Sequence, residues 1–300
     1  MYKSRNDRIF DVANILLLVL LVIVIAYPLY FTLIASVSEP VDVATGQVVL
    51  LPKGFTFDAY KEVFKDDRVW TGYANSLLYT VAGTLLSLAL TIPAAYVLSK
   101  KNLRGRGVLS GYFIFTMFFS GGLIPTYLLV KDMNLLNKPY TLIVLGAFSV
   151  YNMVVARVFY ETSIPSTLYE AAQIDGCSQF GQFFRIAIPL SKPIIAVIAL
   201  YYAVSRWNDF FTALVYITKS DFYPLQLVLR NILLQNQTRM ATMDASVLKA
   251  EELLYLTRQA YMAEAMKYAL IFISSLPMLI AYPFVQKHFV KGVMIGSIKG

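Results

Sequence analysis

The stretch EAAQIDGCSQFGQFFRIAIP, residues 170–189, places three charged residues, two glycines and a closing proline between two strongly apolar segments. Its residues predict two short helices separated by a break. Pro165 suits the first turn of a helix, and Gly176 suits the left-handed conformation that ends one. Ser178 suits the N-cap of a second helix, which Pro189 limits. The stretch is therefore predicted to form a bent helical pair outside the apolar segments.

The rest of the chain has the composition of a membrane protein. Of its 300 residues, 58% are hydrophobic and 15% are charged, whereas a soluble domain typically has about 25% charged residues. The apolar residues form long blocks, which is typical of a polytopic membrane protein. The single cysteine, Cys177, and the single histidine, His288, exclude an intrachain disulfide and a Cys/His metal cluster.

Six apolar blocks are long enough to cross a bilayer, which takes about 20 helical residues. The sequence thus predicts an all-α membrane protein with six transmembrane helices in one domain, residues 1–300. The first block is too long for the h-region of a signal peptide, so an uncleaved span is favoured over a cleaved leader. The predicted spans are residues 14–36, 74–98, 108–130, 140–159, 194–217 and 267–286.

The basic residues predict the orientation. With the N-terminus inside, the inner segments and the inner edge of the fourth span hold 13 Lys+Arg and 5 Asp+Glu, and the rest holds 13 of each kind. The positive-inside rule then places both termini in the cytoplasm. Residues 37–73 and 218–266 lie outside, residues 160–193 form a cytoplasmic loop, and DASVLKAEELLYLTRQAYMAEAMKYA (residues 244–269) is predicted to be helical. The net charge of +8 needs no nucleic-acid partner.

Two interpretations of the cytoplasmic loop follow from its residues. Phe180, Phe183 and Phe184 have the spacing of one helical face. A projecting helical pair with aromatic and acidic residues suits a groove on a soluble partner. The other interpretation is an amphipathic loop that covers lipid headgroups. The residues alone leave both open.

The same stretch resembles the EAA loop of ABC-importer permeases, with Ile188 where leucine is usual. The matching residues are Glu170-Ala171-Ala172, Gly176, Ile186 and Ile188-Pro189. Segments along nearly the whole chain are similar to carbohydrate-uptake permeases related to the maltose system, and are closest to the branch for complex oligosaccharides. These segments include LPKGFTFDAYKEVF, NSLLYTV, GLIPTYLLV, WNDFFTALVYI, YPLQLVLRNIL and FVQKHFVKGVMIGSIKG.

The resemblance implies a type I importer permease in the cytoplasmic membrane, without catalytic residues, whose loop is the coupling helix that sits in a cleft of an ATPase subunit. It implies a second homologous permease, two ATPases that bind ATP and Mg²⁺, and an extracellular solute-binding protein that delivers an oligosaccharide. The chain has no G-x-x-x-x-G-K-[ST] motif, so no cofactor is expected in it. The residues expected at the ATPase contact are Glu170, Ala171, Ala172, Asp175, Gly176, Phe183, Phe184, Pro189 and, in the C-terminal tail, Lys299.

A polar group within the fifth span is a candidate lining of the substrate pathway. It consists of Arg206, Trp207, Asn208 and Asp209. Charged residues inside a membrane are costly and indicate a pathway by default. The alternatives are an Arg206–Asp209 pair that braces the helix and a Trp207 that anchors the span at the interface. A second feature, Ser120-Gly121-Gly122 in the third span, is expected to allow close helix packing.

Two other classes of function compete with a permease subunit. An ion-coupled secondary sugar transporter usually buries ionisable residues in several spans, but Arg206 and Asp209 are almost the only candidates here. A membrane-embedded enzyme would have a thin catalytic inventory, since the chain has one histidine, one cysteine and no carboxylate cluster within the spans.

Overall fold

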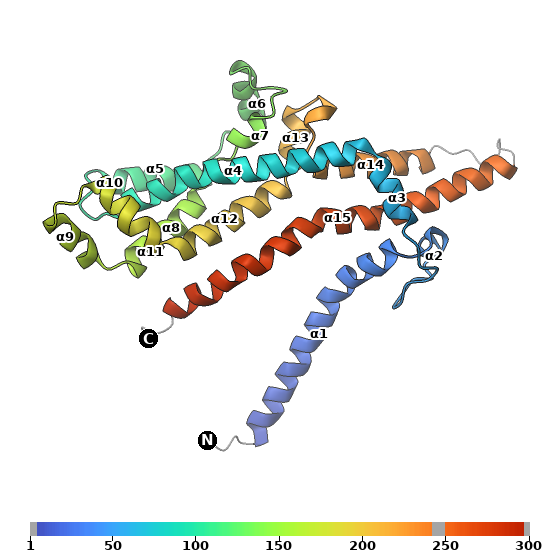
Figure 1. Cartoon of the computed structure of the whole chain (residues 1–300), viewed down its shortest axis with the longest axis horizontal. Coiled ribbons are helices and arrows are strands. Elements are labelled where there is room, and N and C mark those ends of the chain that lie inside the picture. Colours follow the sequence, from blue (N-terminus) through green and yellow to red (C-terminus); the bar gives the residue numbers. More distant parts are fainter. Residues whose placement is uncertain (1–4, 242–249, 297–300) are drawn as a thin grey trace. The chain divides into compact units, whose positions relative to one another are not determined.

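The computed structural model describes residues 5–241 and 250–296 of the chain. These described residues form helices and contain no β-strand, as Figure 1 shows. The predicted all-α fold is therefore confirmed. The chain falls into two compact units, one of Met1–Asp67 with Leu229–Leu276 and the other of Arg68–Val228 with Pro277–Gly300.

The first unit begins with a long apolar helix. Helix α1 (Arg5–Ser36) is continuous in spite of Pro28, and its end packs with the turn that follows through Ile34, Ala35, Val43 and Val48. The same unit holds α2 (Pro40–Ala44) and α3 (Asp58–Lys65), the end of α14 (Leu225–Ala241) and the first half of α15 (Ala250–Gly296).

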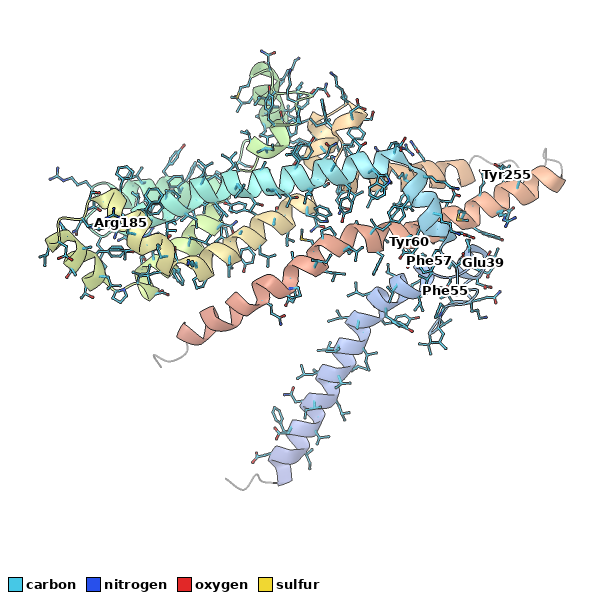
Figure 2. The ribbon with its side chains drawn as sticks, viewed as in Figure 1. Glu39, Phe55, Phe57, Tyr60, Arg185 and Tyr255 are labelled. Carbon is cyan, nitrogen blue, oxygen red and sulfur yellow. The ribbon has the colours of Figure 1, made fainter. Side chains whose placement is uncertain are left out.

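The segment between α1 and α4 is held to α1 by a hydroxyl pair and is packed within itself by aromatic rings. The Tyr60 and Ser36 hydroxyl oxygens lie 2.8 Å apart. Phe55, Phe57 and Tyr60 gather near the start of α3 in Figure 2, with centroid distances of 5.1 Å between Phe55 and Phe57 and 6.1 Å between Phe57 and Tyr60. This segment, predicted to lie outside, is thus ordered by its own contacts.

The core of the second unit lies between one long helix and several shorter ones. Helix α4 (Asp67–Ser99) contributes Ile92, Ala95 and Tyr96 to a cluster with residues of α8 and α12, which run along it in Figure 1. The remaining elements of this unit are α5 (Arg106–Phe118), α6 (Leu123–Asp132), α7 (Thr141–Val144), α8 (Val150–Ser163), α9 (Ser166–Ile174), α10 (Gln179–Gln182), the π turn η1 (Phe183–Ala187), α11 (Ile188–Leu190), α12 (Lys192–Trp207), α13 (Phe211–Tyr216) and η2 (Ser220–Phe222).

The third predicted span is broken at its glycines. Helix α5 ends at Phe118, α6 begins at Leu123, and the two are bent by 110°. Gly122 has φ +84°, and a Cβ at that residue would meet nothing within 4 Å. The expectation that Ser120-Gly121-Gly122 allows close helix packing is therefore wrong: these residues end one helix and turn the chain into the next.

Two other predicted spans are also interrupted. The fourth, residues 140–159, divides into α7 and α8, and the fifth, residues 194–217, divides into α12 and α13. In the described part of the chain, three helical segments are long and apolar enough to cross a membrane, or up to five if each of two bent pairs counts as one span. Hydropathy thus predicts the apolar segments but not the breaks within them. The total of six membrane spans stays a prediction.

Candidate functional site

The break between the two helices of residues 166–190, here called the helix pair, has the predicted local geometry. Gly176 has φ +75°, and a Cβ there would meet nothing within 4 Å, so the backbone angle alone requires glycine. The Cys177 N–H donates to the Ala172 carbonyl at 2.8 Å, which closes the end of α9. The Ser178 hydroxyl accepts from the Gly181 N–H at 3.1 Å and caps α10. The predicted turn and cap are confirmed.

One face of the helix pair is displayed to the surroundings. Ile174 is 87% exposed, Phe180 is 80% exposed, and Phe184 is also exposed. Figure 2 labels Arg185, which projects from the same end of this unit. The other exposed residues among those expected at the ATPase contact are Glu170, Ala171, Asp175, Gly176 and Pro189, and Ala172 is half-buried. Large apolar side chains exposed next to charged ones are typical of an interaction surface.

Phe183 does not belong to the displayed face. It is only 8% exposed, and its ring lies 5.0 Å from the Tyr96 ring of α4. The expectation that Phe183 faces a partner is therefore wrong. It starts the π turn, which contacts the C-terminal end of α4, whereas its neighbour Phe184 faces outward. Conversely, Ile174 was missed, although an isoleucine next to Asp175 in a charged loop is a signal of an exposed contact.

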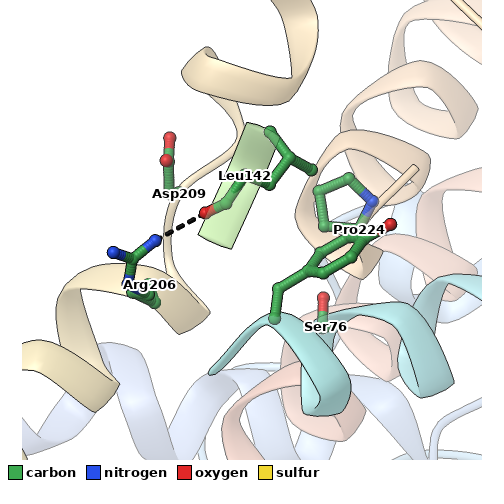
Figure 3. A pocket seen from close by; sticks show the side chains of 6 residues that line it. Ser76, Leu142, Arg206, Asp209 and Pro224 are labelled. Atoms are coloured by element: carbon green, nitrogen blue, oxygen red, sulfur yellow. Dashed lines mark hydrogen bonds between the residues drawn. The ribbon is translucent and has the colours of Figure 1, made fainter. Parts of the chain in front are cut away.

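Arg206 is half-buried among polar groups of the second unit. Its guanidinium Nη1 donates to the Leu142 carbonyl of α7 at 2.5 Å, the bond drawn in Figure 3. The Nε and Nη2 atoms are buried and find no hydrogen-bond acceptor among the described residues. Space for the side chain comes from Gly83 of α4, because a Cβ there would lie 2.5 Å from Arg206 Cδ and Nε.

A cavity of about 20 Å³ adjoins this guanidinium group. That volume suits one water molecule and is too small for a sugar ring. The cavity is lined by residues of α4, α7 and α12 and by residues just before α13 and α14. These residues are Ser76, Tyr79, Leu142, Arg206, Asp209 and Pro224. Asp209 does not pair with Arg206 within the described residues; its carboxylate accepts from the Thr212 N–H at 3.0 Å, in the first turn of α13. The alternative of an Arg206–Asp209 pair is thus not what the structure shows.

The other two residues of the predicted pathway group differ in exposure. Trp207 is 2% exposed, and its ring lies edge-to-face with Tyr73 at 5.6 Å. Asn208 is exposed, and its side-chain amide donates to the Val204 carbonyl at 2.9 Å. Of the four residues, Asn208 is thus the most exposed, whereas Arg206 and Asp209 are half-buried and Trp207 is buried.

Tyr202 and Arg206, one turn apart on α12, hold both sides of the break between α7 and α8. The Arg206 bond to Leu142 reaches the α7 side. On the α8 side, the Ser149 N–H donates to the Tyr202 hydroxyl oxygen at 2.9 Å, and that oxygen lies 2.7 Å from the Thr91 hydroxyl of α4. Between them Gly146 has φ +70°. The sequence alone does not indicate this arrangement, because it depends on contacts between residues more than 50 positions apart.

Lys299 lies outside the described residues, so its expected ATPase contact stays a prediction. The same holds for residues 244–249 of the helix predicted within 218–266, whereas residues 250–269 are helical in α15. Within the described residues, no group of three or more His, Cys, Asp or Glu side chains is arranged to hold a metal ion.

Residues 69–295 match the profile of a family described as the binding-protein-dependent transport system inner membrane component. The chain belongs to this family. It is therefore a multi-pass membrane protein and a transport subunit that works within a larger complex.

Individual relatives extend the likeness over the whole chain. Protein LplC of Bacillus subtilis (strain 168) is 40% identical over 100% of this chain and 98% of that protein. The polygalacturonan/rhamnogalacturonan transport system permease protein YtcP of the same strain is 37% identical over 98% of this chain and all of that protein.

A solved structure has the same fold. The crystal structure of a bacterial ABC transporter involved in the import of the acidic polysaccharide alginate contains a chain that matches with a TM-score of 0.85 and 35% identity, covering 96% of this chain and 99% of that one. The predicted membrane permease fold is therefore confirmed.

Proposed function

We propose that the chain is the permease subunit of an ATP-driven importer that moves an oligosaccharide across the cytoplasmic membrane. The family is that of binding-protein-dependent transport, which favours this function over an ion-coupled secondary transporter. Two similar proteins are named for the transport of polygalacturonan or rhamnogalacturonan and the import of alginate. These names support a polysaccharide-derived substrate for this chain.

The observation that carries the proposal is the exposed helix pair. Its two helices are fixed at one angle by Gly176 and Ser178, and they display Ile174, Phe180 and Glu170. A rigid projection with apolar and charged residues is suited to a groove on a soluble ATPase. ATP and Mg²⁺ then bind to the partner ATPases, and their cycle moves the helix pair.

The remaining parts of the complex complete the import cycle. A second homologous permease forms the pathway together with this chain, two ATPases bind on the cytoplasmic side, and a solute-binding protein delivers the sugar from outside. Both termini lie in the cytoplasm, and Lys299 contacts the ATPases. Alternation between two access states follows from rigid-body movement of the spans.

The contact with the ATPase is tested by substitutions in the helix pair. Gly176→Val forces a β-branched residue into the left-handed region, which costs about 1–2 kcal/mol, and should misdirect α10. Glu170→Lys reverses a charge on the displayed face. Both variants should insert in the membrane but retain less ATPase subunit on copurification, and sugar should stimulate hydrolysis less.

A matched control separates docking from backbone strain. Gly46 also has positive φ, +71°, and a Cβ there would also meet nothing within 4 Å. It lies in the segment 37–73, on the predicted outer side, so Gly46→Val should retain the ATPase. If the helix pair only covers headgroups, Glu170→Lys is neutral or favourable beside anionic lipid. Wild-type retention and stimulation in both helix-pair variants would exclude the docking role.

The substrate pathway is tested at Asn208 and Trp207. Asn208→Ala removes an exposed amide and should lower uptake while assembly, melting temperature and basal hydrolysis are unchanged. Trp207→Ala removes a buried ring and should lower the stability of the complex by about 3–5 kcal/mol. Normal uptake in Asn208→Ala would remove this residue from the pathway.

A further inference from the structure

The first helix of the helix pair is attached to the transmembrane part of its unit mainly through one aromatic residue. Helix α9 has no fully buried residue. Tyr169, half-buried in α9, packs on the core that contains Tyr96 of α4, with 6.0 Å between the two ring centroids. Its neighbours in sequence, Leu168 and Glu170, are exposed. A force on α9 therefore reaches the long helix α4 through the Tyr169 ring.

Lys100 sits against that ring. It follows the last residue of α4, and its ammonium nitrogen lies 3.0 Å from the centroid of Tyr169 and 4.4 Å from the centroid of Tyr96. Tyr96 and Lys100 are four residues apart at the end of α4, and both contact the Tyr169 ring. An ammonium group over aromatic faces is attracted by their quadrupoles, and more strongly when it is desolvated.

Among the residues that the structure describes, no opposite charge near Lys100 explains its place. The titratable groups near the ring cluster are Tyr96 of α4, Tyr160 of α8, Tyr169 of α9 and the Cys177 thiol. Burial lowers the pKa of Lys100 from 10.5 to about 8, and burial raises the pKa of the Tyr169 hydroxyl. That hydroxyl has no hydrogen-bond partner among the described residues, so the ring face is what Tyr169 offers to the lysine.

We propose that Lys100 is a positioning residue that joins α9 to the inner end of α4 by its cation–π contact with Tyr169, so that movement of the docked helix pair is transmitted to α4. The proposal rests on the function proposed above, in which α9 docks on an ATPase. It separates two tasks of the loop. Ile174, Phe180 and Glu170 hold the partner, and Lys100 with Tyr169 carries the displacement onward.

The test uses the whole complex reconstituted in liposomes, with two separate measurements: the amount of ATPase subunit retained, and the number of ATP molecules hydrolysed per sugar imported. Lys100→Met keeps the length of the side chain and removes its charge. It should retain the ATPase like the wild type but raise the ATP used per sugar at least threefold. Lys100→Arg keeps the cation and should stay within twofold of the wild type.

The chain offers a matched control in the next residue. Lys101 is exposed, so Lys101→Met removes the same charge from the same turn and should leave both measurements unchanged. Tyr169→Leu should uncouple like Lys100→Met, whereas Tyr169→Phe keeps the ring face and should remain coupled. This second pair keeps the test decisive even if one lysine variant assembles poorly.

A pH profile separates transmission from a purely structural role. With a pKa of about 8, Lys100 loses its charge as the pH rises from 7 to 9, so ATP used per sugar should rise in the wild type and stay flat in Lys100→Arg. Folding stability should not fall over this range, because the cost of the buried charge declines as it is lost. The melting temperature of Lys100→Met at pH 7 should therefore not drop.

Three results would overturn the proposal. One is an ATP-to-sugar ratio in Lys100→Met equal to that in Lys101→Met. Another is a pH profile of the wild type that matches that of Lys100→Arg. The third is a lower melting temperature in Lys100→Met with an unchanged ratio. Failure of the proposed function has a different signature, because the wild-type chain would then retain no ATPase at all.

Discussion

At the scale of single residues, the absence of a side chain at Gly83 leaves room for the charged Arg206 side chain inside the second unit. The guanidinium group lies where a side chain on Gly83 would be, and it reaches the Leu142 carbonyl from there. A buried charge needs such a partner, because removing it from water is expensive. Gly83 lies in regular helix, so its backbone conformation does not require glycine. Glycine is required there because the Arg206 side chain packs directly against its backbone.

Gly83→Ala should lower the stability of the purified chain. The new Cβ would overlap Arg206 Cδ and Nε, and overpacking of this kind typically costs about 1–3 kcal/mol. Gly111 in α5 provides the control, because a Cβ there meets nothing within 4 Å. Gly111→Ala should be neutral or slightly stabilising. Equal melting temperatures for the two variants in detergent would contradict this prediction, because they would show that the Arg206 side chain can move away from Gly83 without lowering stability.

Local features of the site were predictable, and features set by distant contacts were not. The Gly176 turn and the Ser178 cap follow from neighbouring residues, so the sequence predicts them. The burial of Phe183 depends on Tyr96, 87 positions away, and the place of Arg206 depends on Gly83 and Leu142. No periodicity within one segment carries that information. Among the described residues expected at the ATPase contact, Phe183 is turned inward and Ala172 is half-buried, whereas the others are exposed. Their contact with an ATPase stays a prediction.

At the scale of elements, an ion cluster joins α5 to α8 and to the end of α4. Arg106 and Arg157 share the Glu161 carboxylate, with 2.8 Å between Arg157 Nε and Glu161 Oε1. Arg106 also donates to the Leu98 carbonyl at 2.8 Å, and Arg157 to the Ser110 hydroxyl at 2.8 Å. Four hydrogen bonds thus fix the ends of three helices next to the turn 100–106.

Glu161→Gln should lower the free energy of unfolding by about 1.5–3 kcal/mol, the usual range for hydrogen bonds to a charged group. Burial alone would raise the pKa of Glu161, but Arg157 and Arg106 outweigh burial and lower the pKa below 4.5. A lowered carboxylate pKa gives stability that is present above pH 4.5 and lost as the pH falls below it. The melting-temperature difference between variant and wild type should therefore shrink towards acid pH.

The control for this prediction is an exposed pair. Glu62 pairs with Lys65 at 2.6 Å on the surface of α3, and exposed pairs contribute about 0–1 kcal/mol. Glu62→Gln should leave the melting temperature nearly unchanged at all pH values. A difference for Glu161→Gln that persists unchanged to pH 3 would show that the carboxylate charge is not what holds the helices.

The apolar segments were predictable from hydropathy, and their interruptions only in part. Gly122 has a positive φ at the α5–α6 break, and a Ser-Gly-Gly sequence is a recognisable signal for a turn. The α12–α13 break at residues 208–210 contains neither glycine nor proline. It forms where Asp209 accepts a hydrogen bond from the Thr212 N–H, a local alternative to helix that a hydropathy window does not detect.

At the scale of the whole molecule, the charge distribution predicts the orientation. In a Cys177→Ser background, Leu103→Cys lies in the basic turn 100–106 and should be protected from a membrane-impermeant maleimide in sealed cells. Gln47→Cys, in the segment 37–73, should be labelled. After permeabilisation both should react. Labelling of residue 103 from outside would contradict a cytoplasmic position for this turn and for the helix pair.

The π turn at Phe183–Ala187 has a consequence for angular register. Such a turn uses wider, i→i+5 hydrogen bonding, and each residue of a helix advances the chain by about 100° around the axis. The direction in which Phe180 points relative to α12 is thus set by the number of residues between them as well as by their identity. Removing Ile186 would let the π turn close as ordinary α-helix and leave the direction of Phe180 nearly unchanged, because the wider turn accommodates one extra residue. Inserting one residue into the α-helical part at 188–190 would instead rotate the displayed face by roughly 100° and carry Phe183 away from Tyr96, a larger change than the exchange of an exposed side chain.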